Sequence, residues 1–135
     1  MRTVRFGVSL PENLIRNFDE WIRSKQYPNR SEAIRDLIRK ALIDEAVQSD
    51  QVVLGVLNIV YDHHKRALSD ELAHLQHDYY HLIISVTHVH LDHDNCLEVI
   101  LLKGKARDVQ RLSDKIIALK GVKHGKLYVT SVQNV

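Results

Sequence analysis

The chain has 135 residues, of which 44% are hydrophobic and 27% are charged, a balance typical of one globular domain or two small ones. No stretch approaches the roughly 18 apolar residues of a membrane span, and the first residues lack the apolar core of a signal peptide. A single cysteine, Cys96, excludes an internal disulfide, and a net charge of +2 does not by itself indicate nucleic-acid binding. We expect a cytoplasmic protein with no membrane partner.

Residues 2–10, RTVRFGVSL, alternate between apolar and polar or small side chains. The apolar set, Val4, Phe6, Val8 and Leu10, has the period of two that a strand with one buried face shows. Pro11 stops such a strand and suits the first turn of a helix. The pattern predicts a strand over residues 2–10 followed directly by a helix.

Two amphipathic helices are predicted next. Apolar residues recur at helical spacing from Leu14, so the first helix extends to about Lys25. The stretch QYPN is a turn, after which Asn29 can cap a second helix with Glu32 as its capping-box partner. The polar residues 44–51 end this helix and form a short linker.

One strand and two helices in under fifty residues bury too little surface to fold alone, and a lone strand cannot satisfy its backbone. The simplest remedy is a two-fold dimer whose strands pair antiparallel. The pattern resembles the ribbon-helix-helix DNA-binding fold, which places a two-stranded ribbon in the major groove. The resemblance implies base contacts from Arg5, Gly7 and Ser9 and phosphate contacts from the second helix N-terminus at Asn29, Arg30 and Ser31. The alternative is a small dimerisation module.

The remainder of the chain predicts four strands and two helices. Strands are expected at 52–61, 81–91, 96–104 and 126–132, and helices at 65–76 and 109–119. The order βαββαβ is the ferredoxin-like arrangement, which is also that of ACT-like domains. We therefore predict an α+β protein with one domain over residues 1–48 and a second over residues 52–135. A single sheet of this kind leaves one face to be covered, so association is expected.

The stretch HVHLDHDNC, residues 88–96, places the lone cysteine beside several histidines. His88 and His90 are two residues apart on a strand, so both point to one face, and Cys96 begins the partner strand of the hairpin. An isolated strand histidine is usually a half-exposed polar residue, but two imidazoles and a thiol that converge indicate a metal site. Such a set suits Zn(II), Ni(II) or Cu(II).

The pattern alone leaves the fourth ligand open. We expect His93, in a turn, and His124, in a glycine-flanked loop, to be surface residues. The candidates are His63, His64, His74, His77, His81, His93 and His124.

Five stretches together resemble the nickel-responsive transcriptional regulators of the NikR type. They are RSEAIRDLIRKAL in the second helix, VYDHHKR, QHD at 76–78, HVHLDHDNCLEV at 88–99 and GVKHG at 121–125. The resemblance covers essentially the whole chain. It implies a homotetramer, a dimer of dimers, in which the second domain binds metal and tetramerises.

The resemblance also implies the ligands. One Ni(II) per chain would lie in square-planar geometry at a subunit interface, held by His88, His90 and Cys96 of one chain and His77 of its neighbour. Gln76 and Glu98 match positions that form hydrogen bonds around the ligands. A cation site between the domains would use Glu32 and Asp36, which lie one helical turn apart. The alternative for that pair is a solvated helix face that forms ion pairs with Arg35 or Lys40.

The function implied is a repressor, of nickel-uptake genes, that binds a palindromic double-stranded DNA operator with two half-sites and has no small-molecule substrate. Related proteins often carry Arg-x-Thr-x-Thr on the strand that contacts DNA, where this chain has Arg5, Gly7 and Ser9. Gly7 has no side chain to offer a base, which predicts a different operator or weaker direct readout.

One rival is a ribbon-helix-helix regulator that responds to Co(II), Zn(II) or Cu(II). Another is a metal-dependent enzyme with Glu98 as base, but a closed four-ligand site leaves no vacancy. An antitoxin is disfavoured by the ordered βαββαβ pattern.

Overall fold

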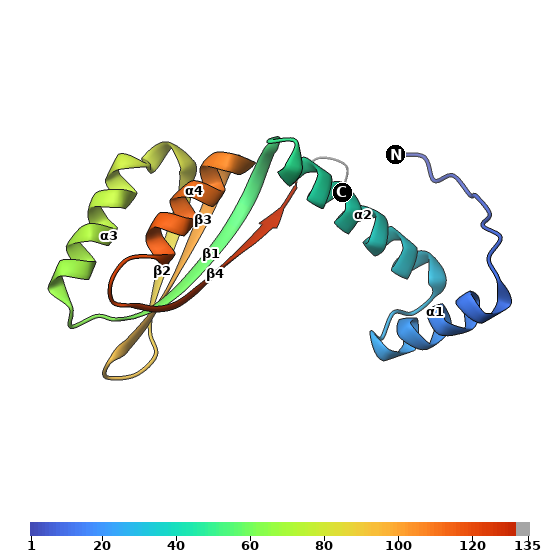
Figure 1. Ribbon diagram of the computed structural model, residues 1–135, viewed down its shortest axis with the longest axis horizontal. Helices are drawn as coiled ribbons and strands as arrows, with labels where there is room; N and C mark the ends of the chain where they lie inside the picture. Colours follow the sequence, from blue (N-terminus) through green and yellow to red (C-terminus); the bar gives the residue numbers. More distant parts are fainter. Residues whose placement is uncertain (132–135) are drawn as a thin grey trace. The chain divides into compact units, whose positions relative to one another are not determined.

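The computed structural model describes residues 1–131, which form two compact units, Met1–Lys40 and a second that begins at Ala41. All the predicted helices are present, as are the four strands predicted after residue 50, while Val132 of the last one lies outside the described residues. The elements in chain order are α1 Glu12–Ser24, α2 Arg30–Gln48, β1 Val52–Asp62, α3 Arg66–Asp78, the 3-10 helix η1 Tyr80–Leu82, β2 Ile83–His90, β3 Asn95–Lys105, α4 Ala106–Ile117 and β4 Val122–Thr130 (Figure 1).

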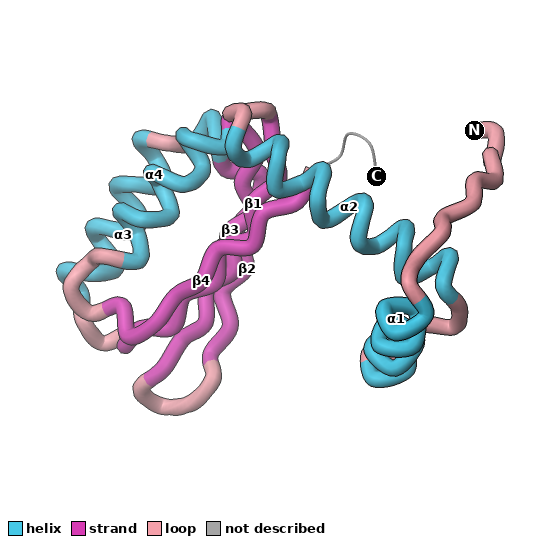
Figure 2. The backbone as a smooth tube through the Cα atoms, turned by 45° about the vertical axis from the view of Figure 1, so that its right-hand side comes forward, coloured by secondary structure: helices cyan, strands magenta, loops and turns pink. Residues whose placement is uncertain are grey.

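The first eleven residues form no strand in the single chain, so the strand predicted at 2–10 is absent there (Figure 2). The physical reason is that a strand forms only when its N–H and C=O groups pair with another strand, and residues 1–40 contain no second strand. The alternating apolar side chains stay exposed, Val4 at 70%, Phe6 at 69% and Val8 at 59%. The predicted apolar face is thus present but uncovered.

Local capping explains where the second helix begins. The Asn29 side-chain oxygen accepts the backbone N–H of Glu32 at 2.9 Å, as the sequence predicted for a helix cap. The Glu32 carboxylate pairs with Arg35. Between the helices, Gln26 has a φ of 63°, and the ring of Trp21 packs against Phe18 and Tyr27. These contacts fix the turn between α1 and α2.

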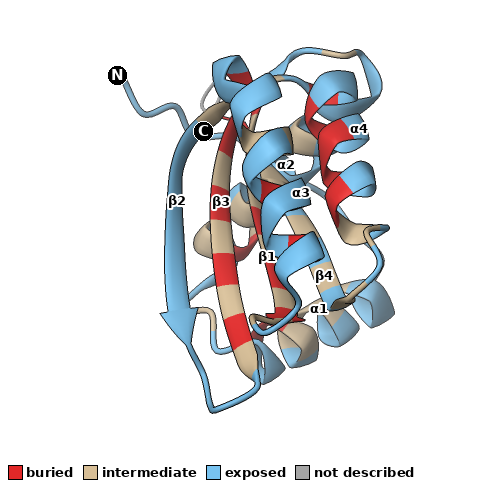
Figure 3. Ribbon diagram, turned by 90° about the vertical axis from the view of Figure 1, so that its left-hand side faces the viewer, coloured by how far each residue is buried: buried red, intermediate tan, exposed pale blue. Residues whose placement is uncertain are grey.

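The second unit is a four-stranded antiparallel sheet in the order β2-β3-β1-β4, with α3 and α4 on one face (Figure 3). Side chains alternate along the two central strands, so that Leu57, Ile59 and Ile100 are fully buried beneath the helices. Gly55 lies where α4 comes close, because an added Cβ would meet Val109 Cγ1 at 2.8 Å. This is the ferredoxin-like topology predicted from the element order.

The other face of the sheet carries apolar side chains that α3 and α4 do not cover. Leu97, Val99 and Leu101 of β3 are only half-buried, and Tyr128 of β4 is 58% exposed. None of the helices in residues 1–131 combines the length and apolar character needed to cross a membrane.

Candidate metal centre

The β2–β3 hairpin brings two histidines and the cysteine to one face of the sheet. Strand pairing sets His90 opposite Cys96 and His88 opposite Glu98. His90 Nδ1 lies 3.4 Å from Cys96 Sγ, and the rings of His88 and His90 have centroids 5.3 Å apart. Cys96 is fully buried, whereas both histidines are exposed. The group therefore has a sheltered sulfur and accessible imidazoles.

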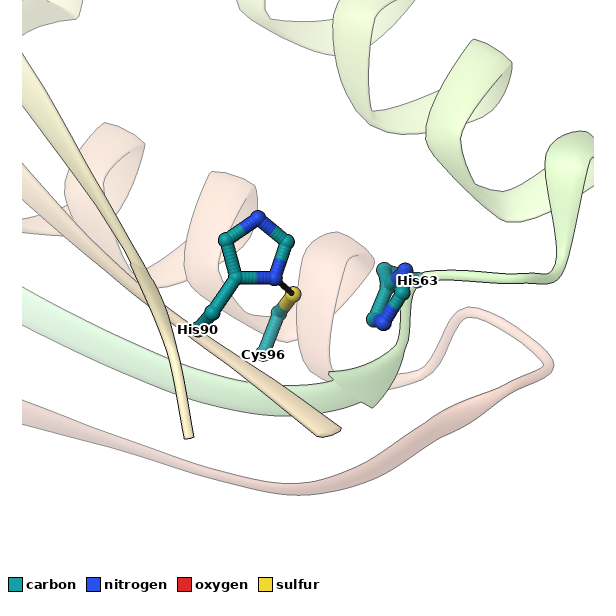
Figure 4. A group of neighbouring side chains, drawn as sticks. All are labelled: His63, His90 and Cys96. Atoms are coloured by element: carbon teal, nitrogen blue, oxygen red, sulfur yellow. Dashed lines mark hydrogen bonds between the residues drawn. The ribbon is translucent and has the colours of Figure 1, made fainter. Parts of the chain in front are cut away.

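The structure adds His63 to this group. Ligand atoms of His63, His90 and Cys96 all lie within 4.8 Å of one another, and the two histidines lie on either side of the sulfur (Figure 4). His63 directly follows β1, whose last residues Tyr61 and Asp62 pair with Cys96 and Asn95. From the sequence, His63 was one of seven candidates for the fourth metal ligand, because its position relative to Cys96 depends on the β1–β3 register.

The thiol is protonated in the metal-free protein at neutral pH. Burial raises the pKa of Cys96, and the nearby carboxylates of Glu98, Asp62 and Asp92 raise it further. A metal ion bound to the sulfur must therefore displace a proton. A thiolate with imidazole nitrogens is a donor set that suits Ni(II), Cu(II) and Zn(II), so the residues present fit a transition metal.

Glu98 is the centre of a buried polar network beside these residues. Its side chain is only 4% exposed, and it accepts hydrogen bonds from the Tyr61 hydroxyl at 2.8 Å and from the Gln76 amide. Burial, and then the bond to Glu98, raises the pKa of Tyr61, so the hydroxyl stays a donor. The Tyr61 ring meets His88 edge-on, with centroids 6.1 Å apart. The network thus links β1, β3 and the last turn of α3.

His77 follows Gln76 on α3 and is exposed. Among residues 1–131, the groups whose ligand atoms lie within mutual reach include neither His77 nor His88, although His88 lies on the same face of the hairpin as His90. His74, one turn earlier, lies 3.4 Å from the Asp78 carboxylate. The chain's own hairpin therefore does not gather His77 into the group around Cys96.

A second group of possible ligands lies at the hairpin tip. His64, His93 and Asp94 have ligand atoms within 4.8 Å of one another and are all exposed. The Nε2 atoms of His63 and His64 contact the His93 carbonyl oxygen at 2.7 and 2.9 Å. His93 is at the surface as predicted.

The loop predicted around His124 was wrong, because this exposed residue pairs with Val60 inside β4. The flanking glycines suggested a turn, but Gly125 sits within the strand. There an added Cβ would meet Ile59 and Ile117 at 2.9 Å. Close packing, and not a turn, explains this glycine.

The residues expected to meet DNA lie in the first unit. Arg5, Gly7 and Ser9 are exposed in the extended N-terminal segment, and Ser31 is exposed at the start of α2. Arg30 forms a two-pronged pair with Asp19, Nε to Oδ1 at 2.9 Å and Nη2 to Oδ2 at 2.8 Å. This pair lowers the pKa of Asp19. Sequence reasoning missed it because the two residues lie on different helices.

Glu32 and Asp36 are engaged within α2 and the turn before it. Glu32 pairs with Arg35, and Asp36 lies 3.3 Å from the Lys40 ammonium and accepts a hydrogen bond from the Tyr27 hydroxyl. The pKa of Asp36 is lowered mainly by the bond from Tyr27. These are the partners expected of a solvated helix face, and the cation site stays a prediction.

Comparison with known proteins matches both parts of the chain. The family model described as the NikR C-terminal nickel-binding domain matches residues 54–130, and that of copG-family ribbon-helix-helix proteins matches residues 4–45. A protein from Desulfovibrio desulfuricans, named as a nickel-responsive regulator, is 59% identical over 121 residues, 90% of this chain and 88% of that protein. One from Geobacter sulfurreducens with the same name is 52% identical over 130 residues, 96% of this chain and 94% of that protein.

A solved structure shares the fold alone. An uncharacterized protein from Thermotoga maritima superimposes with a TM-score of 0.53 at 18% identity, covering 58% of this chain and 98% of that one.

Fold, sequence matches and donor set define a ribbon-helix-helix DNA-binding protein with a nickel-binding domain. The chain belongs to the NikR family of nickel-responsive transcriptional regulators, which are not enzymes.

Proposed function

We propose that this regulator is a cytoplasmic repressor of nickel-uptake genes and that one Ni(II) per chain promotes its binding to operator DNA. A DNA-binding domain comprises residues 1–48, and a metal-binding and tetramerisation domain comprises residues 52–135. The observation that carries the proposal is the hairpin that sets His88, His90 and a buried thiol on one face.

The proposed ligands are His88, His90 and Cys96 of one chain and His77 of a neighbouring chain. Support for assigning His77 to a neighbouring chain comes from its position: it is exposed on α3, whereas the other three residues share the β2–β3 hairpin. These residues would hold Ni(II) through imidazole and thiolate donors, and the ion would then link two chains. Gln76 and Glu98 would hold the backbone around these ligands through the partly buried hydrogen bond between them.

The assembly we propose is a homotetramer, a dimer of dimers. In the first unit, Val4, Phe6 and Val8 line a groove of about 690 Å³ with Ile15 and Ile34, and a second copy of this segment would complete a two-stranded ribbon. The half-buried apolar face of the β1–β3–β4 sheet offers a further surface for association. Two DNA-binding domains related by a two-fold axis imply a palindromic operator with two half-sites.

Nickel can favour DNA binding only if it binds the DNA-competent assembly better than the incompetent one. A ligand set shared between chains has this property, because its affinity depends on how the chains are placed. Arg5 and Ser9 would then contact bases, with Gly7 between them offering no side chain, and the start of α2 would contact phosphates.

The proposal is tested by nickel titration of the metal-stripped full chain. We expect a thiolate-to-nickel charge-transfer absorption that saturates at one Ni(II) per chain and is absent in Cys96→Ala. His74→Ala, which changes an exposed histidine on α3, should keep the full band. Circular dichroism verifies that each variant is folded. A wild-type protein without this band, or a band retained in Cys96→Ala, would contradict the proposed site.

Arg30 allows a separate test of the DNA interface. If its guanidinium leaves Asp19 for a phosphate, Arg30→Gln should weaken binding to duplex DNA. The slope of log affinity against log salt should then fall by about 0.9 for each chain that contacts a phosphate. Lys25→Gln, an exposed cation between α1 and α2, is the matched control. An unchanged slope in Arg30→Gln would mean that Arg30 serves only to join the two helices.

A further inference from the structure

We propose that Tyr79 and Lys115 are positioning residues for nickel binding: the hydrogen bond between them keeps the last turn of α3, and with it His77, in one position. The inference rests on the proposed function, because it takes His77 as the ligand that this chain supplies to a neighbour. Neither Tyr79 nor Lys115 is a ligand in the proposed site, so both act on the metal only through the position of α3.

The second half of α3 has little hydrophobic anchorage. Helices α3 and α4 lie side by side on one face of the sheet (Figure 1 and Figure 3), but α4 buries five side chains. Helix α3 buries only Leu68 and Leu72, both more than one turn before His77. Leu75 is half-buried, and His77 and Asp78 are exposed. Local unfolding begins where buried contacts are few, so the position of His77 depends on other interactions.

Two polar contacts hold the chain on either side of His77. Gln76, directly before it, donates a hydrogen bond to the buried Glu98 carboxylate of β3. The Lys115 ammonium of α4 donates to the hydroxyl of Tyr79, two residues after His77, with 2.7 Å between Nζ and Oη. His77 therefore lies between one residue tied to the sheet and another tied to α4.

Tyr79 also joins α3 to the segment that follows. Its backbone N–H donates to the Leu75 carbonyl oxygen, and its own carbonyl oxygen accepts from the Leu82 N–H, both at 2.9 Å. Its half-buried ring packs against the core. Leu82 is buried over β3, so close that a Cβ added at Gly104 would meet Leu82 Cδ2 at 2.5 Å. The bond from α4 thus fixes the residue at which α3 ends and η1 begins.

This anchor acts on nickel affinity through the population of one conformation. When a protein adopts its binding-competent conformation only part of the time, its affinity for the ligand is reduced by that fraction. The net contribution of one hydrogen bond corresponds to a factor of about two to ten in such an equilibrium. Loss of the Tyr79–Lys115 bond should therefore weaken nickel binding by about this factor.

The test is Ni(II) titration of the full metal-stripped chain, in competition with a chelator of known nickel affinity. In Lys115→Met the ammonium is lost and the apolar stem is kept, and in Tyr79→Phe only the hydroxyl is lost. Both variants should bind nickel about two- to tenfold more weakly than wild type. The backbone amides of residues 77–82 should also exchange hydrogen faster in both variants.

The chain offers a conservative variant and matched controls for this test. Lys115→Arg should bind nickel like wild type, because a guanidinium can still donate to the Tyr79 hydroxyl. Lys120→Met removes an exposed ammonium just beyond α4, and Tyr80→Phe removes a hydroxyl from the adjacent exposed ring. Neither control should change nickel affinity or the exchange of residues 77–82.

A double variant separates positioning of His77 from a general effect on the fold. In a His77→Ala background, Lys115→Met should cause no further loss of nickel affinity, because the ligand that Lys115 positions is absent. A contribution to the fold alone would lower nickel affinity by the same factor in both backgrounds.

Two results would overturn the inference. One is an unchanged nickel affinity in either Lys115→Met or Tyr79→Phe, and the other is an equal loss from Lys115→Met with and without His77. Failure of the proposed function has a different signature. In that case His77→Ala alone would bind nickel as tightly as wild type, and the inference would fail with it.

Discussion

His77→Ala is expected to fold normally and to lose the nickel-dependent gain in DNA affinity. The side chain is exposed at the last turn of α3, so its truncation removes no core contact. If it supplies the fourth ligand to a neighbouring chain, nickel can still bind the hairpin but no longer ties two chains together. Allosteric couplings between two sites are typically 1–3 kcal/mol, about 5- to 150-fold in affinity, and the variant should show a ratio near one.

The measurement is fluorescence anisotropy of a labelled duplex, selected from a random library by the nickel-loaded wild type, with and without Ni(II). His74→Ala is the matched control, because His74 lies one turn earlier on the same helix, is exposed and pairs with Asp78 of that helix. It should keep the wild-type gain. If the His77→Ala protein still binds the duplex better with nickel, His77 does not couple nickel binding to DNA binding.

The parts of the site that depend on local pattern could be predicted from the sequence. Alternation along a strand places His88 and His90 on one face, and a short hairpin brings Cys96 opposite. The strand at 2–10 was predicted by the same rule, and its apolar face is there, but its hydrogen bonds require a second chain. The local sequence pattern thus identifies which side chains of a strand share a face. The pairing of that strand can be predicted only when its partner strand is known.

The rest of the site depends on contacts between distant segments. His63 reaches Cys96 only because β1 pairs with β3 in one particular register. Glu98 gains its partners from β1 and α3, at sequence separations of 37 and 22 residues. The run CLEVILL shows that position 98 shares the buried face with Cys96 and Ile100, so a buried carboxylate could have been inferred. Its two donors could not, because neither is set by local spacing.

Glu98→Gln is expected to weaken nickel binding about 10- to 100-fold, the usual effect of changing a group that orients metal ligands. It should also lower the free energy of unfolding by about 1–3 kcal/mol. The carboxylate accepts from the Tyr61 hydroxyl through one oxygen and from the Gln76 amide through the other. A glutamine has only one acceptor oxygen, so one buried donor faces an NH₂ group and loses its partner. Gln76 directly precedes His77, and the Tyr61 ring contacts His88. A network that has lost one hydrogen bond therefore holds these two ligands less firmly in position.

Exchanging the two side chains separates this network effect from a simple loss of charge. In the double variant Gln76→Glu, Glu98→Gln, the glutamine oxygen can accept from Tyr61 while its NH₂ group donates to the new carboxylate. Every buried donor again has an acceptor, so nickel affinity and unfolding free energy should both recover most of the loss. Isothermal titration with Ni(II) and urea unfolding measure the two quantities, and Glu71→Gln, exposed on α3, is the control. If Glu98→Gln binds nickel like wild type, the network supports the fold alone. If the exchange gives no recovery, the charge at position 98 matters more than the hydrogen bonds.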